Sequence, residues 1–201
     1  MRSPANKIVI LLLLLPASLA GTQRKEYFTE AEIDLIRDAQ ELPMRLNVYF
    51  RFADLRLNAL GLKEKTAKEK EKERKDQEQH QKEVRDAQKA GKPAPKAAER
   101  PDVYLADFTR SELLRGYAEA LDEAMINIDD FYSRKLDVRD ALERLERYAK
   151  EQLPLVKTFQ PKNNTEALAR DEAVEMTQKA IEDAHAALEI VPKTEKTGKK
   201  P

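Results

Sequence analysis

The sequence predicts an all-α protein, built as an antiparallel helical bundle of about four helices with a long charged insertion. Two observations favour this fold class. Only five of the 201 residues are glycine, whereas nucleotide-binding sheets and β-sandwiches need many glycine turns. Apolar residues recur at helical spacing in several segments, and they are set among good helix formers such as Ala, Leu, Glu and Lys.

Residues 1–20 have the features of a signal peptide. A basic start precedes an unbroken apolar run at 8–15, and Ser18 and Ala20 are the small residues that a signal peptidase reads. The run is shorter than the roughly 20 residues that span a bilayer. We therefore expect cleavage after Ala20 and an exported, soluble protein of the periplasm or the cell exterior.

The charge balance argues against several classes of partner. Lys and Arg total 37 and so do Asp and Glu, and removal of residues 1–20 leaves a net charge of −2. This balance is unlike that of a nucleic-acid binder, and no second segment is apolar enough to span a membrane. The chain has no cysteine, which excludes thiol nucleophiles, Cys-based zinc sites and disulfides. Packing alone has to hold the fold.

Residues 21–62 are expected to form the N-terminal helices of the bundle. Thr29 and Glu32 fit a capping box, so the first helix should begin at Thr29. Pro43 ends or kinks this helix, and a second helix can begin there and run to Leu60. One side of the second helix carries six apolar residues, which are Leu46, Tyr49, Phe50, Ala53, Leu57 and Leu60.

The opposite side of the helix at 43–60 is apolar as well. Its residues are Met44, Val48, Phe52 and Leu55. A helix that is apolar on two sides is either central in the bundle, which we favour, or offers a face for self-association or a protein partner. Arg51, Asp54 and Arg56 are expected to form an ion-pair strip beside this face, and exposed strips of this kind contribute little stability.

Residues 63–101 are a charged low-complexity segment that ends in a Pro/Ala linker. Of the 24 residues at 63–86, 17 are charged, so they cannot form a core. Glu64, Glu71 and Glu78 each precede a lysine by four residues, a spacing that stabilises helices. The composition fits a solvated single helix and a disordered segment equally well.

Residues 102–191 are expected to form the C-terminal helices of the bundle. Heptad spacing typical of coiled coils runs through 114–131 and continues after Val138. This pattern allows one long helix over 109–153 or two helices divided by a turn at 134–136. Asp137 is a good cap before Val138 and favours the turn.

The end of the chain predicts one more helix and a tail. Pro154 is expected to kink or end the preceding helix, and the last helix is expected to begin near Asn164 or Thr165, which are capping residues. The same residues lie in a glycosylation sequon at 163–165, for which helix capping is the favoured interpretation. Val174, Ile181 and Leu188 repeat every seven residues in the last helix. Residues 192–201 are expected to form a disordered, lysine-rich tail.

No residue pattern predicts a catalytic or cofactor site. Glu182 and His185 form the Glu-x-x-His motif of di-iron bundles, but a second such motif does not occur. A surface ion pair is therefore the favoured interpretation of His185. Haem ligation by Met44 and His185 is a weaker alternative, since methionine on an apolar face usually fills space. We expect no cofactor and no enzymatic activity.

Three stretches resemble uncharacterised secreted all-helical proteins of bacteria. They are Arg45–Arg56, Ile128–Tyr132 and Asp137–Leu142. The resemblance covers residues 29–62 and 102–190, and it implies an exported helical protein without implying any activity, cofactor or site residue.

The sequence as a whole favours a non-enzymatic protein-interaction or structural protein. Two alternatives stay open, and each has its own motivation. A metal- or haem-binding periplasmic bundle is motivated by Glu182 and His185. A helical periplasmic chaperone is motivated by the charged segment. No small-molecule substrate and no particular partner can be identified from the residues.

Overall fold

The computed structural model describes residues 27–91 and 105–192. The predicted signal peptide, the linker after Gly91 and the tail from residue 193 lie outside the described residues. All regular elements in the described part of the chain are helices, which confirms the all-α fold class. They are α1 (Glu30–Asp38), α2 (Leu42–Ala59), α3 (Ala67–Lys89), the short 3₁₀ helix η1 (Leu105–Asp107), α5 (Arg110–Ser133), α6 (Arg139–Lys157) and α7 (Asn164–Ile190).

Local signals in the sequence determine where most helices begin. The Thr29 hydroxyl accepts a hydrogen bond from the backbone N–H of Glu32 at 3.2 Å, so the predicted capping box is confirmed. Pro43 lies in the first turn of α2, where a missing N–H breaks no helical bond. The last helix begins at Asn164 as expected, but its cap is Asn163, whose side chain accepts from the backbone N–H of Glu166 at 2.9 Å, and not Asn164 or Thr165.

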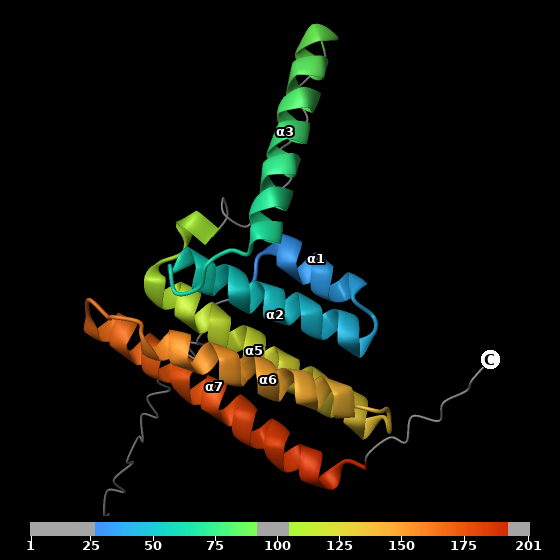
Figure 1. Ribbon diagram of the computed structural model, residues 1–201, viewed down its shortest axis with the longest axis vertical. Coiled ribbons are helices and arrows are strands. Elements are labelled where there is room, and N and C mark those ends of the chain that lie inside the picture. The colour runs from blue at the N-terminus through green and yellow to red at the C-terminus, as the bar shows by residue number, and fades with distance from the viewer. Residues whose placement is uncertain (1–26, 92–104, 193–201) are drawn as a thin grey trace, which may run out of the picture.

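The charged segment is helical and stands apart from the other helices. Figure 1 shows α3 projecting from the rest of the molecule, and no other described helix packs along it. At about 1.5 Å per residue, its 23 residues span about 34 Å. Charged side chains of α3 pair with one another, since Arg74 lies 2.8 Å from Glu71 and 2.7 Å from Glu78. The predicted pair of Glu71 with Lys75 is present at 3.4 Å.

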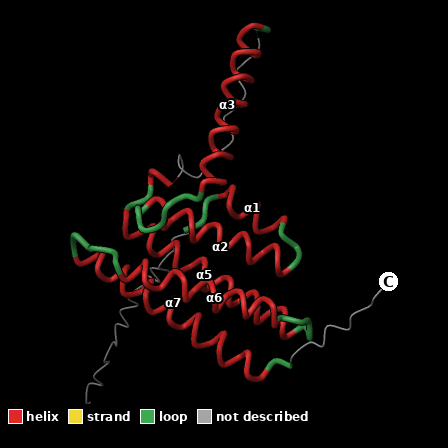
Figure 2. Tube along the Cα trace, viewed as in Figure 1, coloured by secondary structure: helices red, strands yellow, loops and turns green. Residues whose placement is uncertain are grey.

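A tight turn separates α5 from α6, so the prediction of two helices is confirmed. Lys135 lies in this turn with a φ of 62°. The Asp137 carboxylate accepts a hydrogen bond from the backbone N–H of Arg139 at 3.0 Å, at the start of α6. Pro154 does not end α6, because the helix continues to Lys157. Figure 2 shows the short loops that join these helices.

The helices α1, α2, α5, α6 and α7 form what we call the helical body. Helix α5 packs against α2 on one side and α7 on the other, and α6 packs along α7. In Figure 1, α2 and α6 run in the direction opposite to α5 and α7. Helix α6 also meets α2, where the ring of Tyr148 stacks on Phe50 with 4.2 Å between ring centroids.

The core is built from large side chains on α2, α5 and α6 and from small ones on α7. Ala169, Ala173 and Ala180 are fully buried, which lets α5 and α6 approach α7 closely. The predicted heptad residues of α7 lie only half-buried at the edge of this core, and they are Val174, Ile181 and Leu188. Because two helices pack against α7, its smallest residues face inward and its larger ones flank them.

The turn between α5 and α6 allows a test by glycine substitution. A non-glycine residue in the left-handed region costs about 1–2 kcal/mol, so Lys135→Gly should raise the free energy of unfolding by about 1 kcal/mol after its entropic cost. Urea unfolding would measure the difference. Lys135→Ala keeps the backbone strain and serves as the control. A Gly variant that is no more stable than the Ala variant would contradict this account of the turn.

Candidate functional site

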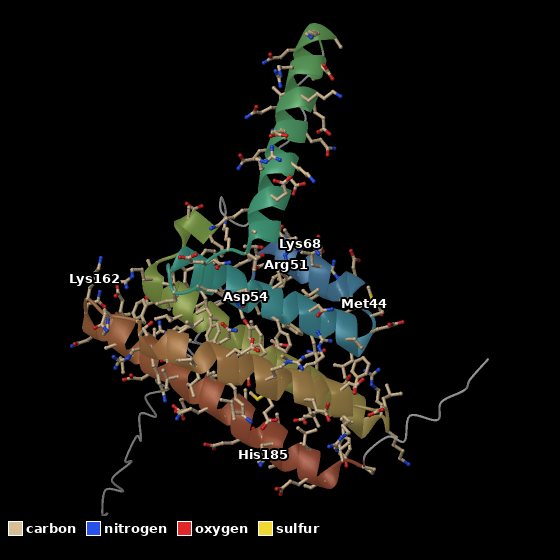
Figure 3. The ribbon with its side chains drawn as sticks, in the orientation of Figure 1. Met44, Arg51, Asp54, Lys68, Lys162 and His185 are labelled. Carbon is tan, nitrogen blue, oxygen red and sulfur yellow. The ribbon has the colours of Figure 1, made fainter. Side chains whose placement is uncertain are left out.

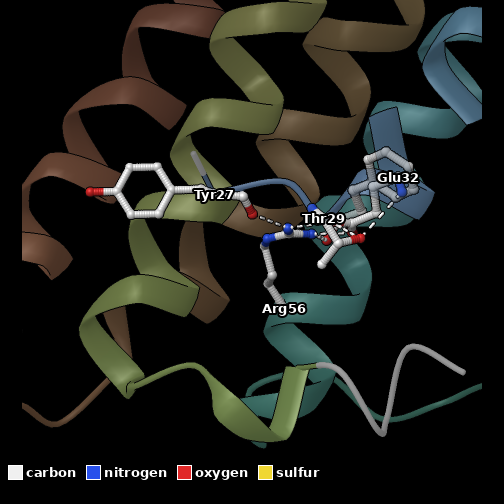
Figure 4. A network of polar contacts seen from close by, with 5 residues as sticks. Tyr27, Thr29, Glu32 and Arg56 are labelled. Carbon is white, nitrogen blue, oxygen red and sulfur yellow. Dashed lines mark hydrogen bonds and ion pairs between the residues drawn. The ribbon is translucent and has the colours of Figure 1, made fainter. Parts of the chain in front are cut away.

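A fully buried ion pair joins α1 to α2. The side chains of Arg56 and Glu32 have 0% exposure, and both guanidinium Nη atoms donate to the carboxylate, each at 2.8 Å. Arg56 also donates to the backbone carbonyls of Phe52 and Tyr27. Figure 4 shows this network, in which Glu32 accepts from Arg56 and from the Thr29 backbone at once. These bonds satisfy both Nη atoms and offset part of the cost of burying the two charges, whereas Nε of Arg56 is buried without a hydrogen-bond partner among the described residues.

A glycine on α5 makes room for the arginine. A Cβ atom at Gly116 would lie 2.4 Å from Nε of Arg56, so any other residue would displace the guanidinium. The guanidinium of Arg56 also lies over the Phe28 ring, with 5.3 Å from Cζ to the ring centroid. This enclosed pair has no surface on which a substrate can be bound. Its consequence is structural, since it fixes α1 against α2 and α5.

Two features of the sequence are signals of this buried pair. Gly116 is the only glycine inside an apolar helical segment, which indicates a close approach by another group. Arg56 follows Phe52 and Tyr49 at helical spacing, on the side of α2 that is buried. The predicted ion-pair strip of Arg51, Asp54 and Arg56 is therefore wrong, because Arg56 lies in the core and Arg51 is exposed.

Asp54 belongs to a different cluster at the contact between α2 and α6. Its carboxylate lies 2.6 Å from Nζ of Lys63 and accepts from the Tyr148 hydroxyl at 2.7 Å. Burial, and next the Asp54 charge, raise the pKa of Tyr148 well above its ordinary value. The Tyr148 phenol therefore stays protonated at neutral pH and serves as a hydrogen-bond donor between the two helices.

A second buried tyrosine links α2 to α5. The Asn127 amide donates to the Tyr49 hydroxyl at 3.0 Å and accepts from Arg45 at 2.8 Å. Burial raises the pKa of Tyr49 to about 12, the Glu123 charge adds to this shift, and Arg45 and Asn127 partly offset it. The neutral phenol is thus the form that the fold favours.

The residues of the predicted partner face do not share one environment. Met44, labelled in Figure 3 near the start of α2, is 54% exposed. Val48 and Leu55 are half-buried. Phe52 is 1% exposed and packs 5.7 Å from Phe28, measured between ring centroids. Phe52 therefore belongs to the core beneath α1 and has no surface to offer a partner, which corrects its place in the predicted face.

The predicted metal and haem residues lie on the surface of the helical body. His185 Nδ1 is 3.1 Å from Oε1 of Glu146 on α6, with the His185 side chain 66% exposed. Its partner is therefore on a neighbouring helix, while Glu182 of its own helix is exposed. Lys150, and then His185, lower the pKa of Glu146. Met44 and His185 are both exposed, so they do not face each other across a core as haem ligands would.

The described residues hold no group of three or more His, Asp or Glu side chains placed to share a metal ion. None of the helices in the described part of the chain has the length and apolar content that a membrane crossing requires. No family model, curated protein or solved structure matches the chain.

The buried pair of Arg56 and Glu32 predicts a large loss of stability from a single conservative substitution. Glu32→Gln keeps the shape and capping ability of the side chain but leaves the Arg56 charge buried without a counter-charge, so the free energy of unfolding should fall by about 3 kcal/mol. Chemical denaturation would measure it. Arg37→Ala removes an exposed pair with Asp34 and should cost less than about 0.5 kcal/mol. Equal losses in the two variants would show that the burial of Glu32 and Arg56 has no energetic consequence.

The raised pKa of Tyr49 predicts a loss of stability in alkali. The unfolded phenol ionises near pH 10 and the folded one near pH 12, so the stability that Tyr49 contributes is complete below pH 10 and is lost as the pH rises toward 12. Between pH 9 and 11, the free energy of unfolding of the Tyr49→Phe variant should fall by about 1 kcal/mol less than that of the unaltered protein. Tyr132→Phe, at a half-exposed position, is the control. Identical pH profiles for all three proteins would contradict the assignment.

Proposed function

We propose that this chain is an exported, non-enzymatic protein that binds other proteins. In this proposal α2, α5, α6 and α7 form an antiparallel four-helix bundle, α1 closes one side of it, and α3 is an arm inserted between two bundle helices. The observation that carries the proposal is the projection of α3 away from the helical body, with no other described helix packed along it. Because the described residues of α3 contribute no buried side chain to the core, we infer that its role lies in contacts outside the chain.

The side chains of α3 suit contacts with a polar protein surface. Salt bridges within the helix, such as Arg74 with Glu71 and Glu78, support its conformation without a core. The helix is therefore preorganised, and less conformational entropy is lost on binding than for an unfolded segment. Charges of both signs along α3 favour a partner with a mixed charge pattern over a nucleic acid or an anionic membrane.

Export is consistent with the way the body is held together. The chain has no cysteine, so neither disulfide formation nor thiol oxidation affects it in an oxidising compartment. The buried pair of Arg56 and Glu32 and the alanine-lined packing of α7 supply the stabilisation instead. The predicted signal peptide and the resemblance to secreted helical proteins support the same location.

Photo-crosslinking in the native cells would test the proposal. A crosslinking amino acid at Gln79, which is exposed on α3, should capture protein partners, whereas one at Ala186, exposed on α7, should capture few. Arg74→Pro with Gln81→Pro breaks the arm and should abolish capture from position 79, while the melting temperature of the body changes by less than about 3 °C.

Two results would count against the proposal. Identical partners at positions 79 and 186 would show that α3 has no special role in binding. Capture that persists after the proline substitutions would show that a helical arm is not required. Export is checked separately by N-terminal sequencing of the processed protein, which should begin at Gly21, and a protein that keeps residues 1–20 would contradict it.

A further inference from the structure

The chain leaves the helical body at a tight turn between α2 and α3 (Figure 1). Gly61 has a φ of 72°, a left-handed conformation that glycine adopts at no steric cost. The backbone N–H groups of Leu62 and Lys63 then both donate to the Leu57 carbonyl, at 2.9 and 3.3 Å. The Leu62 side chain also packs against the core. These contacts tie residues 61–63 to the end of α2, and α3 begins only four residues after them.

The side chain of Lys63 ties the same turn to two helices of the body. Its Nζ atom donates to Oδ1 of Asp54 on α2 at 2.6 Å, and it lies 5.7 Å from the centroid of the Tyr148 ring on α6. An ammonium group within about 6 Å of a ring centroid is attracted by the negative face of the ring. The same oxygen of Asp54 accepts from the Tyr148 hydroxyl at 2.7 Å. Lys63, Asp54 and Tyr148 therefore contact one another directly.

Partial burial makes this contact stronger than an ordinary surface ion pair. The side chains of Lys63 and Asp54 are 26% and 24% exposed. Water and salt screen an exposed pair almost completely, whereas a pair that is largely covered is screened less. The Tyr148 ring is itself held in place, because it is stacked on Phe50 with 4.2 Å between the ring centroids. Lys63 is thus bound to a fixed surface that α2 and α6 form together.

We infer that Asp54, Lys63 and Tyr148 form a latch that fixes the direction in which α3 leaves the helical body. When the contact of Lys63 is broken, α3 stays helical, because ion pairs within the helix support it, and it turns about residues 61–66. The helix spans about 34 Å, so a turn of about 10° at its base moves its far end by about 6 Å. The latch acts in the same way whether or not α3 binds a partner.

Distances between pairs of spin labels measure the direction of α3. The chain has no cysteine, so two introduced cysteines can carry the labels. Labels at Gln88 on α3 and Ala186 on α7, which are both exposed, report the position of α3 relative to the body. Lys63→Met removes the charge and leaves the hydrogen bond between Tyr148 and Asp54 in place. In this variant the distribution of distances should become about twice as broad, because turns of about 10° or more at the base of α3 are then allowed.

Further measurements separate the latch from other effects. Labels at Lys68 and Gln88, both exposed on α3, should give the same distribution in every variant, since the helix itself is intact. Glu64→Gln removes an exposed charge one residue after Lys63, and this matched control should cause no broadening. Asp54→Asn should broaden the distribution between α3 and α7 as Lys63→Met does. The double variant should broaden it no further, because both substitutions remove the same contact.

Three results would overturn the latch. The first is an unchanged distribution between α3 and α7 in Lys63→Met, and the second is equal broadening in Glu64→Gln. The third is broadening between the two labels within α3, which would show that the helix itself has changed and not its direction. Circular dichroism checks that each variant is folded. Lys63→Met decides the question even if Asp54→Asn unfolds, because it leaves the contact between α2 and α6 intact.

Discussion

The ion pair between Arg56 and Glu32 is the interaction on which the arrangement of α1, α2 and α5 depends. Each of these helices contributes one part of it: Glu32 comes from α1, Arg56 from α2, and Gly116 of α5 leaves the space that the guanidinium occupies. Two full charges without solvent contact are costly to bury. The pair is tolerated because Glu32 accepts bonds at both oxygens and Arg56 donates to two carbonyls as well.

The geometry of this ion pair fixes the register of α1 along α2, which apolar packing alone does not do. Apolar side chains tolerate small displacements of one helix along another, whereas a bidentate contact with 2.8 Å bonds at both nitrogens allows one register. Helix α1 has only nine residues and buries little surface of its own. A single directional contact therefore fixes the position of α1, whereas extensive packing fixes the positions of α5 and α7. The aromatic ring of Phe28 adds a contact with the guanidinium of Arg56.

The parts of the fold that could be predicted from the sequence are those that local chemistry determines. Thr29 and Asn163 cap their helices through contacts within four residues, and Asp137 marks the turn before α6. The burial of Phe52 and Arg56 could not be predicted in the same way. Both depend on contacts with residues 24 positions earlier in the chain, Glu32 for Arg56 and Phe28 for Phe52. Helical spacing alone does not say which of the two apolar sides such contacts cover.

The inward face of α7 could not be predicted from the sequence either, for a different reason. A heptad of larger apolar residues was present in the sequence, but alanines occupy the core, because α5 and α6 both approach this helix closely. A cavity lined by Asn58, Lys65 and Leu113 could not be predicted from sequence patterns, because these residues come from three separate segments that only the folded chain brings together.

The helical body and α3 maintain their helices by opposite means. The helical body buries its apolar residues and displays few of them, whereas α3 has no core and depends on ion pairs between exposed side chains. Ion pairs of this kind are weakened by salt, so the helicity of α3 is more sensitive to ionic strength than that of the body. In the function we propose, this separation would leave the packing around Arg56 and Glu32 undisturbed when a partner binds α3.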